Sequence, residues 1–368
     1  MSDVIHLVIT IVLFFAILGG LVLVHELGHF ITARLAGIRV LEFGIGFPPR
    51  ARILRSKGET LYTLNWLPIG GFVKLEGEDG DATDDPRSFA RARLPVKLVI
   101  LVSGVAMNLL TAFLIFTAIA WLATPLVGVQ FFEVQPGSPA AAAGLQPGDA
   151  ILGVNGRQYD FFGKSDVLDD LRQDAGQTVA LTVQHPDGRI ERIPVALRPA
   201  KQLDADHGPL GIVGKTTPFK NLFFGSTGRD LPSAVGIGAD QTQRWFGVIL
   251  SGLGDLVHQV ATNPTAPPPV AGPIGIATQI GDVFFGVGPV MTLYVAAILS
   301  ANLALVNILP FPPLDGGRMV LITLKAVLGR RISLRAEQLT YVVGFVVLFA
   351  FLIWVSGFDI VRILSGGT

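Results

Sequence analysis

The residues with the clearest chemical meaning stand at the end of the first apolar stretch, in the sequence His25-Glu26-Leu27-Gly28-His29. Residues four apart lie on one face of a helix, so two histidines at this spacing can bind one metal ion. Glu26 lies a third of a turn from His25, near enough to reach a water molecule on that ion. Two histidine ligands and a glutamate general base form the zincin pattern. The alternative, two histidines that cap a membrane helix, is disfavoured because three ionisable groups at membrane depth are costly without a function.

Two histidines do not complete a catalytic zinc site, which usually has three protein ligands and one open position. The chain contains no cysteine, so the third ligand must be a histidine, an aspartate or a glutamate. The other histidines lie at the far end of the first apolar stretch or in polar segments, and we expect them to be solvated: His6, His185, His207 and His258. The best candidate is Asp315.

Asp315 lies in the segment Asn307-Ile308-Leu309-Pro310-Phe311-Pro312-Pro313-Leu314-Asp315-Gly316-Gly317. Its prolines and glycines break the helix, and irregular backbone at membrane depth is tolerated only where it is buried in protein or lines a cavity. Taken alone, an Asp-Gly pair is usually just a turn. Beside a His-Glu-x-x-His motif at the same membrane face, it predicts a third metal ligand.

The composition is that of a polytopic membrane protein with some soluble mass attached. Half of the 368 residues are apolar, 15% are charged, and the mean hydropathy is +0.56. Soluble proteins carry about 25% charged residues. The formal net charge is zero, so nothing indicates nucleic acid as a partner. A span takes about 20 mostly apolar residues, and the stretches that are long enough are residues 4–24, 96–123, 289–309 and 339–355.

The loop charges predict how these stretches cross the membrane. Basic residues are concentrated in residues 31–95 and in the loop after the third stretch. Under the positive-inside rule both segments are cytoplasmic, and the termini and the long central segment lie outside. The first stretch has Asp3 and no basic residue before it, and no cleavage site after it, so we interpret it as a retained anchor. We therefore expect a multi-pass protein of the cell inner (plasma) membrane with its active site toward the cytoplasm.

Two further segments have clear patterns. Residues 39–45 and 60–66 are rich in β-branched and aromatic side chains between Gly and Pro, which predicts a small membrane-associated hairpin or sheet. Residues 231–260 have apolar side chains at helical spacing mixed with polar ones. Two interpretations of that segment stay open: an amphipathic helix that contacts membrane lipid on the outer surface, or a connector packed on the spans.

The central segment, from near Val127, alternates turn residues with short apolar strands. Its distinctive runs are Pro136-Gly137-Ser138-Pro139-Ala140, Ala143-Gly144-Leu145-Gln146-Pro147-Gly148-Asp149 and Val154-Asn155-Gly156. We expect a helix over 166–174 and strands over 179–184 and 190–197, joined by a turn at Asp187-Gly188. The segment resembles a PDZ domain in its circularly permuted form, with another small β-rich domain as the alternative. This implies a groove for a peptide or protein ligand, with its carboxylate loop at residues 126–129.

Over nearly its whole length the chain resembles the site-2 protease family of intramembrane zinc metalloproteases, of the bacterial regulator-of-sigma-E protease type but with a single PDZ domain. Besides the two ligand motifs, the resemblance is carried by Phe43-Gly44-Ile45-Gly46-Phe47, Pro68-Ile69-Gly70-Gly71-Phe72-Val73, the region of Asn108, and Gly272-Pro273-Ile274-Gly275-Ile276-Ala277. One departure is visible, because the family usually has Gly-Pro where this chain has Gly104-Val105. The change touches no ligand, but it can alter a kink in the second span.

The resemblance implies that zinc (Zn2+) is held by His25, His29 and Asp315, with Glu26 as general base. The implied substrates are single-span membrane proteins, such as anti-sigma factors or remnant signal peptides, cut within or near their transmembrane segments. A substrate helix must unwind first, because its carbonyls are tied in the helical ladder. Substrate-binding roles are implied for two glycine motifs, which would hold the opened segment as an added strand, and for an asparagine: Gly44, Gly46, Gly70, Gly71 and Asn307.

Two other hypotheses belong to different classes. A catalytically lapsed membrane PDZ adaptor would act through its peptide groove alone, and a metal transporter would bind zinc at membrane depth. The complete set of His25, Glu26, His29 and Asp315 argues against the first. A transporter would carry polar residues along a path, whereas here they gather at one end of the spans.

We thus expect a polytopic α-helical membrane protein of about four transmembrane helices, with a membrane-associated β hairpin or sheet and an inserted soluble PDZ domain. The expected order is a first span with the zinc motif (1–38), a cytoplasmic membrane-associated β region (39–95), a second span (96–124), the PDZ domain (127–216), an extracytoplasmic linker with an amphipathic helix (217–288), and the third and fourth spans with the Asp-Gly motif (289–368).

Overall fold

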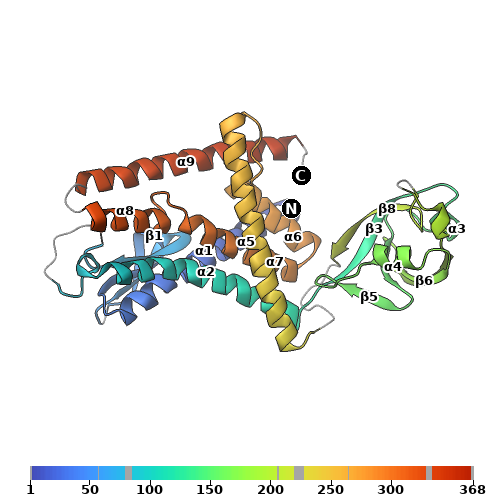
Figure 1. Ribbon diagram of the computed structural model, residues 1–368, viewed down its shortest axis with the longest axis horizontal. Helices are drawn as coiled ribbons and strands as arrows, with labels where there is room; N and C mark the ends of the chain where they lie inside the picture. Colours follow the sequence, from blue (N-terminus) through green and yellow to red (C-terminus); the bar gives the residue numbers. More distant parts are fainter. Residues whose placement is uncertain are drawn as a thin grey trace. The chain divides into compact units, whose positions relative to one another are not determined.

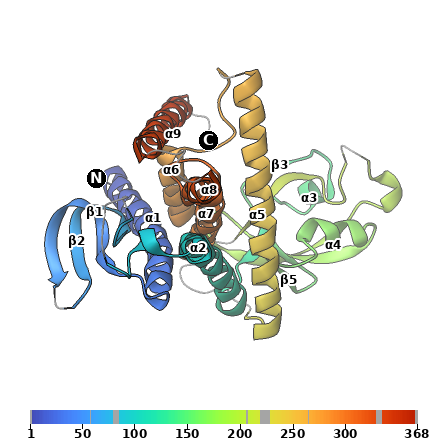
Figure 2. The ribbon, with the colours of Figure 1, turned by 60° about the vertical axis from the view of Figure 1, so that its left-hand side comes forward.

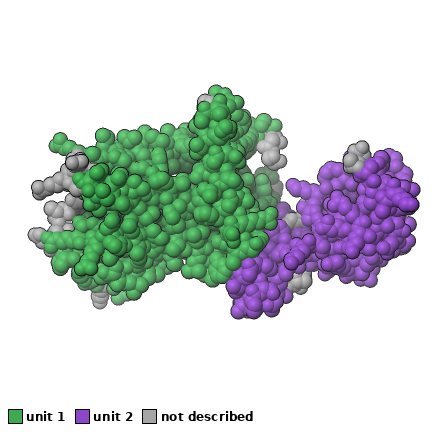
Figure 3. Space-filling model, in the orientation of Figure 1, with its two compact units in different colours: residues 1–116, 238–283, 292–368 green, residues 117–237, 284–291 purple. Residues whose placement is uncertain are grey.

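The computed structural model describes residues 2–56, 58–78, 85–204, 207–218, 228–263, 265–328 and 334–365. The chain forms two compact units (Figure 3). Unit 1 comprises residues 1–116, 238–283 and 292–368, and unit 2 comprises residues 117–237 and 284–291.

The helices account for most of unit 1. In chain order, the helices of the described residues are α1 (Ser2–Leu35), η1 (Phe89–Arg91), α2 (Leu94–Leu122), α3 (Pro139–Ala142), α4 (Val167–Gln173), η2 (Ala200–Gln202), α5 (Leu231–Thr262), α6 (Pro273–Gly286), α7 (Pro289–Ile308), α8 (Asp315–Leu328) and α9 (Leu334–Leu364) (Figure 1). Here η marks a short 3-10 helix.

Four of these helices, α1, α2, α7 and α9, are long and apolar enough to cross a membrane. Each contains, to within one residue at its C-terminal end, one of the apolar stretches expected from the sequence, so the prediction of four candidate spans is confirmed. Large apolar side chains cover the outside of α1 and α9, whereas α7 is the most buried of the four. This distribution suits two helices that face lipid and one that lies inside the bundle.

Helix α1 is longer than the apolar stretch that predicts it. It continues through the His-Glu-x-x-His motif without a break and ends at Leu35, because no proline interrupts it and Gly28 is tolerated inside the helix. Its 34 residues correspond to about 51 Å at about 1.5 Å per residue, more than the roughly 30 Å of the hydrocarbon core. The motif is therefore part of a rigid helix and not of a loop that follows it.

The expected hairpin beside the spans is present as strands β1 (Val40–Arg55) and β2 (Leu61–Leu75). Both strands are longer than expected, because they bend and pair twice. Residues 42–45 pair with residues 61–64 on one side and with residues 71–74 on the other. Figure 2 shows the hairpin beside α1, and β2 contacts that helix.

Unit 2 is built around an antiparallel sheet with the order β7-β6-β4-β5-β3-β8. Its strands are β3 (Leu126–Val134), β4 (Ala150–Val154), β5 (Arg157–Asp160), β6 (Thr178–Gln184), β7 (Ile190–Ala196) and β8 (Ile212–Pro218). Apolar side chains from the sheet and from α3 and α4 form one continuous core. The helix and the two strands expected near residues 166–197 correspond to α4, β6 and β7.

One expectation for this unit is wrong. Residues 126–129 do not form a carboxylate-binding loop but lie in β3, which is paired on both sides. Val129 lies opposite Ile151 of β4 on one side and opposite Thr216 of β8 on the other. The backbone groups of β3 are thus already used within the sheet, and the strand at this end of the sheet is β8.

Helix α5 confirms the helical periodicity of residues 231–260 and packs on a span. Trp245 Nε1 of α5 donates a hydrogen bond of 2.8 Å to the Tyr294 hydroxyl of α7, which donates to Gln241 Oε1, also at 2.8 Å. These contacts support the interpretation of α5 as a connector packed on the spans. They involve one face of the helix and leave apolar side chains such as Val248 and Val257 exposed on others.

Candidate active site

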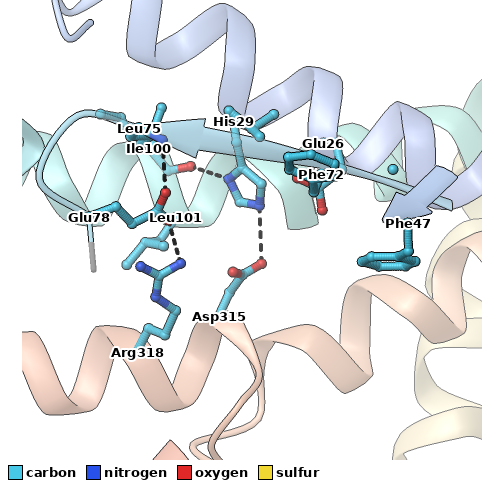
Figure 4. A pocket seen from close by; sticks show the side chains of 12 residues that line it. Glu26, His29, Phe47, Phe72, Leu75, Glu78, Ile100, Leu101, Asp315 and Arg318 are labelled. Carbon is cyan, nitrogen blue, oxygen red and sulfur yellow. Dashed lines mark hydrogen bonds and ion pairs between the residues drawn. The ribbon is translucent and has the colours of Figure 1, made fainter. Parts of the chain in front are cut away.

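His25, His29 and Asp315 meet at one point, although Asp315 is 290 residues from His25 in the chain. His25 Nε2 lies 2.9 Å from Asp315 Oδ2, His29 Nε2 lies 3.3 Å from the same oxygen, and the two ring nitrogens are 3.1 Å apart. Figure 4 shows the His29 ring on α1 pointing at Asp315 at the start of α8. Both histidines are buried and Asp315 is half-buried.

The spacing of these three ligand atoms fits zinc. Zinc binds histidine nitrogen and carboxylate oxygen at about 2.0–2.2 Å in a tetrahedral shell, which places neighbouring ligand atoms roughly 3.3 Å apart. The observed separations of 2.9, 3.1 and 3.3 Å are close to that value. Three ligands leave the fourth tetrahedral position for water or substrate, as in catalytic zinc sites.

Asp315 is held in place by the irregular segment that precedes it. Helix α7 ends at Ile308, the chain turns through residues 309–314, and α8 begins at Asp315. A Cβ on Gly316 would overlap the carbonyl oxygen of Ile308, and one on Gly317 would lie 2.5 Å from backbone atoms of the turn. Only glycine fits at these two positions, which explains why the aspartate is followed by two glycines.

The side-chain type of Asp315 suits a metal ligand. Its Oδ2 atom lies within 3.3 Å of Nε2 of both histidines, and an ionised carboxylate is the form that binds metal.

Each histidine ring is oriented by a group on α2. The Nδ1–H of His29 donates to the carbonyl oxygen of Ile100 at 2.8 Å, which leaves its Nε2 free as a ligand. His25 Nδ1 lies 3.4 Å from the side-chain amide of Asn108, whose Oδ1 is buried without a hydrogen-bond partner among the described residues. Because a half-turn of the amide exchanges its oxygen and nitrogen, Oδ1 can accept from His25 Nδ1–H and leave Nε2 for the metal.

Two glycines allow α2 to lie against α1 at the motif. A Cβ on Gly28 would lie 2.5 Å from the Ser103 carbonyl oxygen, and one on Gly104 would lie 2.5 Å from His29 Nε2. Small residues at such a position let helices approach closely inside a membrane. Val105, the visible departure from the family pattern, is a buried residue of α2. Helix α2 runs without interruption from Leu94 to Leu122.

Glu26 shares a cavity of about 200 Å³ with His29 and Asp315 (Figure 4). The cavity is also lined by residues of the hairpin, the turn after β2, α2 and α8: Phe47, Gly71, Phe72, Val73, Leu75, Glu78, Ile100, Leu101 and Arg318. A carboxylate, two of the three candidate metal ligands and a strand of the hairpin thus face the same small space. This arrangement can bring an extended peptide, a water molecule and a base together.

The four glycines with predicted substrate-binding roles differ in position. Gly71 lines the cavity, whereas Gly44, Gly46 and Gly70 are not among its lining residues. Gly44 faces the Phe72 ring, which a Cβ would overlap, and Gly46 and Gly70 have φ angles of +79° and +73°. These three glycines shape the bends of the hairpin that carries Gly71 and Phe72 to the cavity.

Asn307 lies beside the cluster of His25, His29 and Asp315, as its place in the sequence suggests. It occupies the last turn of α7, and its Nδ2 is 3.5 Å from His25 Nε2. That distance is too long for a firm hydrogen bond, so the amide is available to another partner. The other histidines are elsewhere: His185 contacts Asp149, and His207 contacts Asp204, both within unit 2.

An ion pair between Glu78 and Arg318 closes one side of the cavity, and neither residue stands out in the sequence. Arg318 Nη1 donates to Glu78 Oε1 at 2.6 Å, and Glu78 Oε2 accepts from Leu75 N at 3.0 Å. Burial alone would lower the pKa of Arg318, but the Glu78 carboxylate outweighs it and raises that pKa, so the guanidinium stays charged. The pair ties the end of β2 to the helix that begins with Asp315.

Comparison with known proteins finds relatives that match most of the chain. The model of peptidase family M50 matches residues 13–351. Zinc metalloprotease RasP of Geobacillus kaustophilus is 26% identical over 434 residues, which cover 95% of this chain and 97% of the relative. A Nostoc sp. protein with a zinc metalloprotease name is 31% identical over 350 residues, or 90% of this chain and 91% of the relative. ARASP2 of Arabidopsis thaliana, named as a chloroplastic membrane metalloprotease, is 32% identical over 88% of this chain and 73% of the relative.

The predicted zinc cofactor and metalloprotease activity are thereby confirmed, and a lapsed adaptor and a transporter are disfavoured. The chain belongs to peptidase family M50, the site-2 proteases, and is a zinc metalloprotease.

Proposed function

We propose that this protease cleaves single-span membrane proteins within or next to their transmembrane segments, as in regulated intramembrane proteolysis. One observation carries the proposal: His25, Glu26 and His29 are part of α1, a helix long and apolar enough to span a bilayer. A site on such a helix is accessible to substrates that are themselves in the membrane. Anti-sigma factors and remnant signal peptides are the substrate classes we expect.

The metal-binding roles that we propose are His25 and His29 through Nε2 and Asp315 through a carboxylate oxygen. Zinc bound there supplies a Lewis acid that acidifies water and polarises a peptide carbonyl. Glu26 takes a proton from the attacking water and delivers it to the leaving amine. The rings are kept in the required orientation by Ile100 O and by Asn108.

The substrate must be extended when it is cut, and residues 71–74 offer a strand that can receive it. They pair with residues 42–45 on one side, and among the described residues no strand pairs with their other edge. An unwound substrate segment can therefore add to this edge and recover the backbone hydrogen bonds lost from its helix. Asn307, at the end of α7, would bind a peptide group of the same segment.

We further propose that unit 2 acts as a PDZ domain. Its edge strand β8 follows the sequence Leu210-Gly211, in which Gly211 has a φ of +75°. This places the proposed carboxylate-binding turn before β8 and not at residues 126–129. An extended peptide or protein ligand would add to β8, and the unit would act as a size filter or a sensor of the trimmed substrate.

The proposed setting is the cell inner (plasma) membrane, with the cluster toward the cytoplasm and unit 2 outside. The positive-inside pattern of the loops supports this orientation. The apolar outer surfaces of α1 and α9 would contact membrane lipid.

Glu26→Gln tests the proposal in full-length protein reconstituted with a single-span model substrate. The variant keeps the shape of the side chain but not its basicity, so we expect bound zinc to stay at the wild-type amount and cleavage to be lost. Glu133→Gln, on the exposed side of β3, is the matched control and should cleave normally. Undiminished cleavage by Glu26→Gln would contradict the mechanism, and equal cleavage of a soluble polypeptide would contradict the membrane substrate.

A further inference from the structure

A second, larger cavity in unit 1 has no role in the mechanism above. Its volume is about 950 Å³, near the upper end of the roughly 300–1,000 Å³ typical of binding pockets. It lies between the segment after β2, the first turn of α2, helix α8 and the first turns of α9. Because α2 and α9 begin here, the cavity lies at the ends of two spans.

This second cavity adjoins the catalytic one. Glu78 and Arg318 are lining residues of both, so their ion pair is the partition between the two spaces. The two side chains of this partition are held together by their opposite charges, at 2.6 Å. The partition can therefore open by the separation of two side chains, without movement of α8.

The lining of the second cavity suits a polypeptide. Lys325 pairs with Glu337 at 2.7 Å, and Lys97 Nζ donates to the Ala90 carbonyl oxygen at 2.8 Å. Between these polar groups lie apolar side chains: Phe89, Leu94, Ile322 and Val342. A lipid tail would require a continuous apolar wall, whereas an extended peptide needs both apolar contacts and polar partners for its backbone.

We propose that this cavity receives the part of the substrate on the cytoplasmic side of the scissile bond, and that the Glu78–Arg318 pair is the gate through which this part passes. The inference rests on the proposed function. It follows from the two residues that line both cavities, because a strand added along residues 71–74 runs toward Leu75, whose N–H donates to Glu78. The released fragment would leave by the same route.

Cysteine crosslinking tests this path directly, because the chain has no cysteine of its own. Single cysteines are placed by Phe72→Cys in the catalytic cavity, Ala326→Cys in the second cavity, and Val327→Cys as the matched control, each combined with Glu26→Gln. Val327 is the next residue of α8, is 76% exposed and is not part of either lining. The substrates are versions of one single-span protein with a single cysteine moved along the span and its cytoplasmic flank.

We expect Ala326→Cys to form disulfides with substrate positions on the cytoplasmic side of those that Phe72→Cys captures, and Val327→Cys to form none. Capture by Phe72→Cys without capture by Ala326→Cys would overturn the path while leaving the proposed function intact. Equal capture by Ala326→Cys and Val327→Cys would also overturn it. If Phe72→Cys captures no membrane substrate, the proposed function itself fails, and this inference fails with it.

Adding Glu78→Gln to the same variants tests the gate. This change keeps the shape of the side chain and an acceptor for Leu75 N but removes the charge that holds Arg318. We expect the yield of the Ala326→Cys crosslink, relative to that of Phe72→Cys, to rise several-fold. If the pair is only a structural tie, that ratio will not change, and the gate is refuted.

Discussion

The two units of this protein differ in the proportion of polar side chains that they bury. The core of unit 2 is apolar, with residues such as Phe131, Ile151 and Leu181 fully buried. Unit 2 buries a few polar side chains, such as Asp149, whereas unit 1 buries more of them, among them Asn108, Ser300 and the two histidines of the motif. Its large apolar side chains are exposed on the outer faces of helices such as α1 and α9.

The difference follows from the solvent around each unit. Unit 2 gains stability when apolar surface leaves water, so its interior is apolar. In a membrane the outside is already apolar, and polar groups must find partners inside the protein. Some buried polar residues of unit 1 therefore lie at the candidate site, and others link one helix to another. Ser300 is an example of such a link, because its hydroxyl donates a hydrogen bond from α7 to the Asn108 carbonyl oxygen of α2.

The largest effect on stability is expected from the apolar core of unit 2. Phe131 is fully buried, so Phe131→Ala should destabilise the unit by about 3–5 kcal/mol, through lost apolar contacts and the cavity left behind. Its neighbour Phe132 is 64% exposed, and Phe132→Ala should change stability by no more than about 0.5 kcal/mol. Limited proteolysis of full-length protein measures both. Equal rates of proteolysis for the two variants would contradict the claim that the apolar core stabilises unit 2.

A smaller effect on stability is expected from the loss of an interhelical hydrogen bond in unit 1. Asp359 is buried in α9, and its carboxylate accepts from Gly272 N at 3.2 Å and from Gly275 N at 2.9 Å, at the start of α6. Hydrogen bonds to charged groups contribute about 1.5–3 kcal/mol, and Asp359→Ala should lose about that much. Thermal unfolding in detergent measures this, with the exposed Asp282→Ala of α6 as control.

If Asp359→Ala is no less stable than Asp282→Ala, the hydrogen bonds of Asp359 between α9 and the start of α6 do not stabilise unit 1. Gly272 and Gly275 support the expectation, because a Cβ on either would lie within 2.8 Å of the Asp359 carboxylate. The same contact explains why glycines stand at these positions of the sequence.

The smallest effect on stability, and the most specific one, is expected at Asn108. Loss of a group that orients a metal ligand typically weakens metal binding by about 10–100-fold. Asn108→Ala should therefore bind zinc more weakly, whereas Asn108→Asp keeps an acceptor for His25 Nδ1–H and should retain most of the affinity. Competition with a chelator measures both. Equal affinities of the two variants would show that Asn108 only fills space.

The sequence was sufficient for the parts of this account that depend on short spacing or composition. His25, Glu26 and His29 share one helical face, and the break around Asp315 is visible in the prolines and glycines beside it. The four candidate spans follow from hydropathy. Each of these signals is local, and no long-range contact is needed to interpret it.

The remaining features depend on contacts between distant residues. The Arg318–Glu78 pair joins residues 240 apart, and Asn108 meets His25 across 83 residues. No local pattern indicates such pairs. The prediction of a carboxylate-binding loop at residues 126–129 is wrong for the same reason. A short apolar run fits either a loop or a strand, and the pairing of β3 with β8 decides between them.

The central claim is that His25, His29 and Asp315 hold one zinc ion, and zinc content measures it most directly. Wild-type protein, Asp315→Ala and the exposed control Asp282→Ala are purified in detergent and analysed for bound metal. We expect wild-type protein and Asp282→Ala to carry equal amounts of zinc and Asp315→Ala to have lost nearly all of it while remaining folded. Full zinc occupancy in folded Asp315→Ala would contradict the assignment of the third ligand.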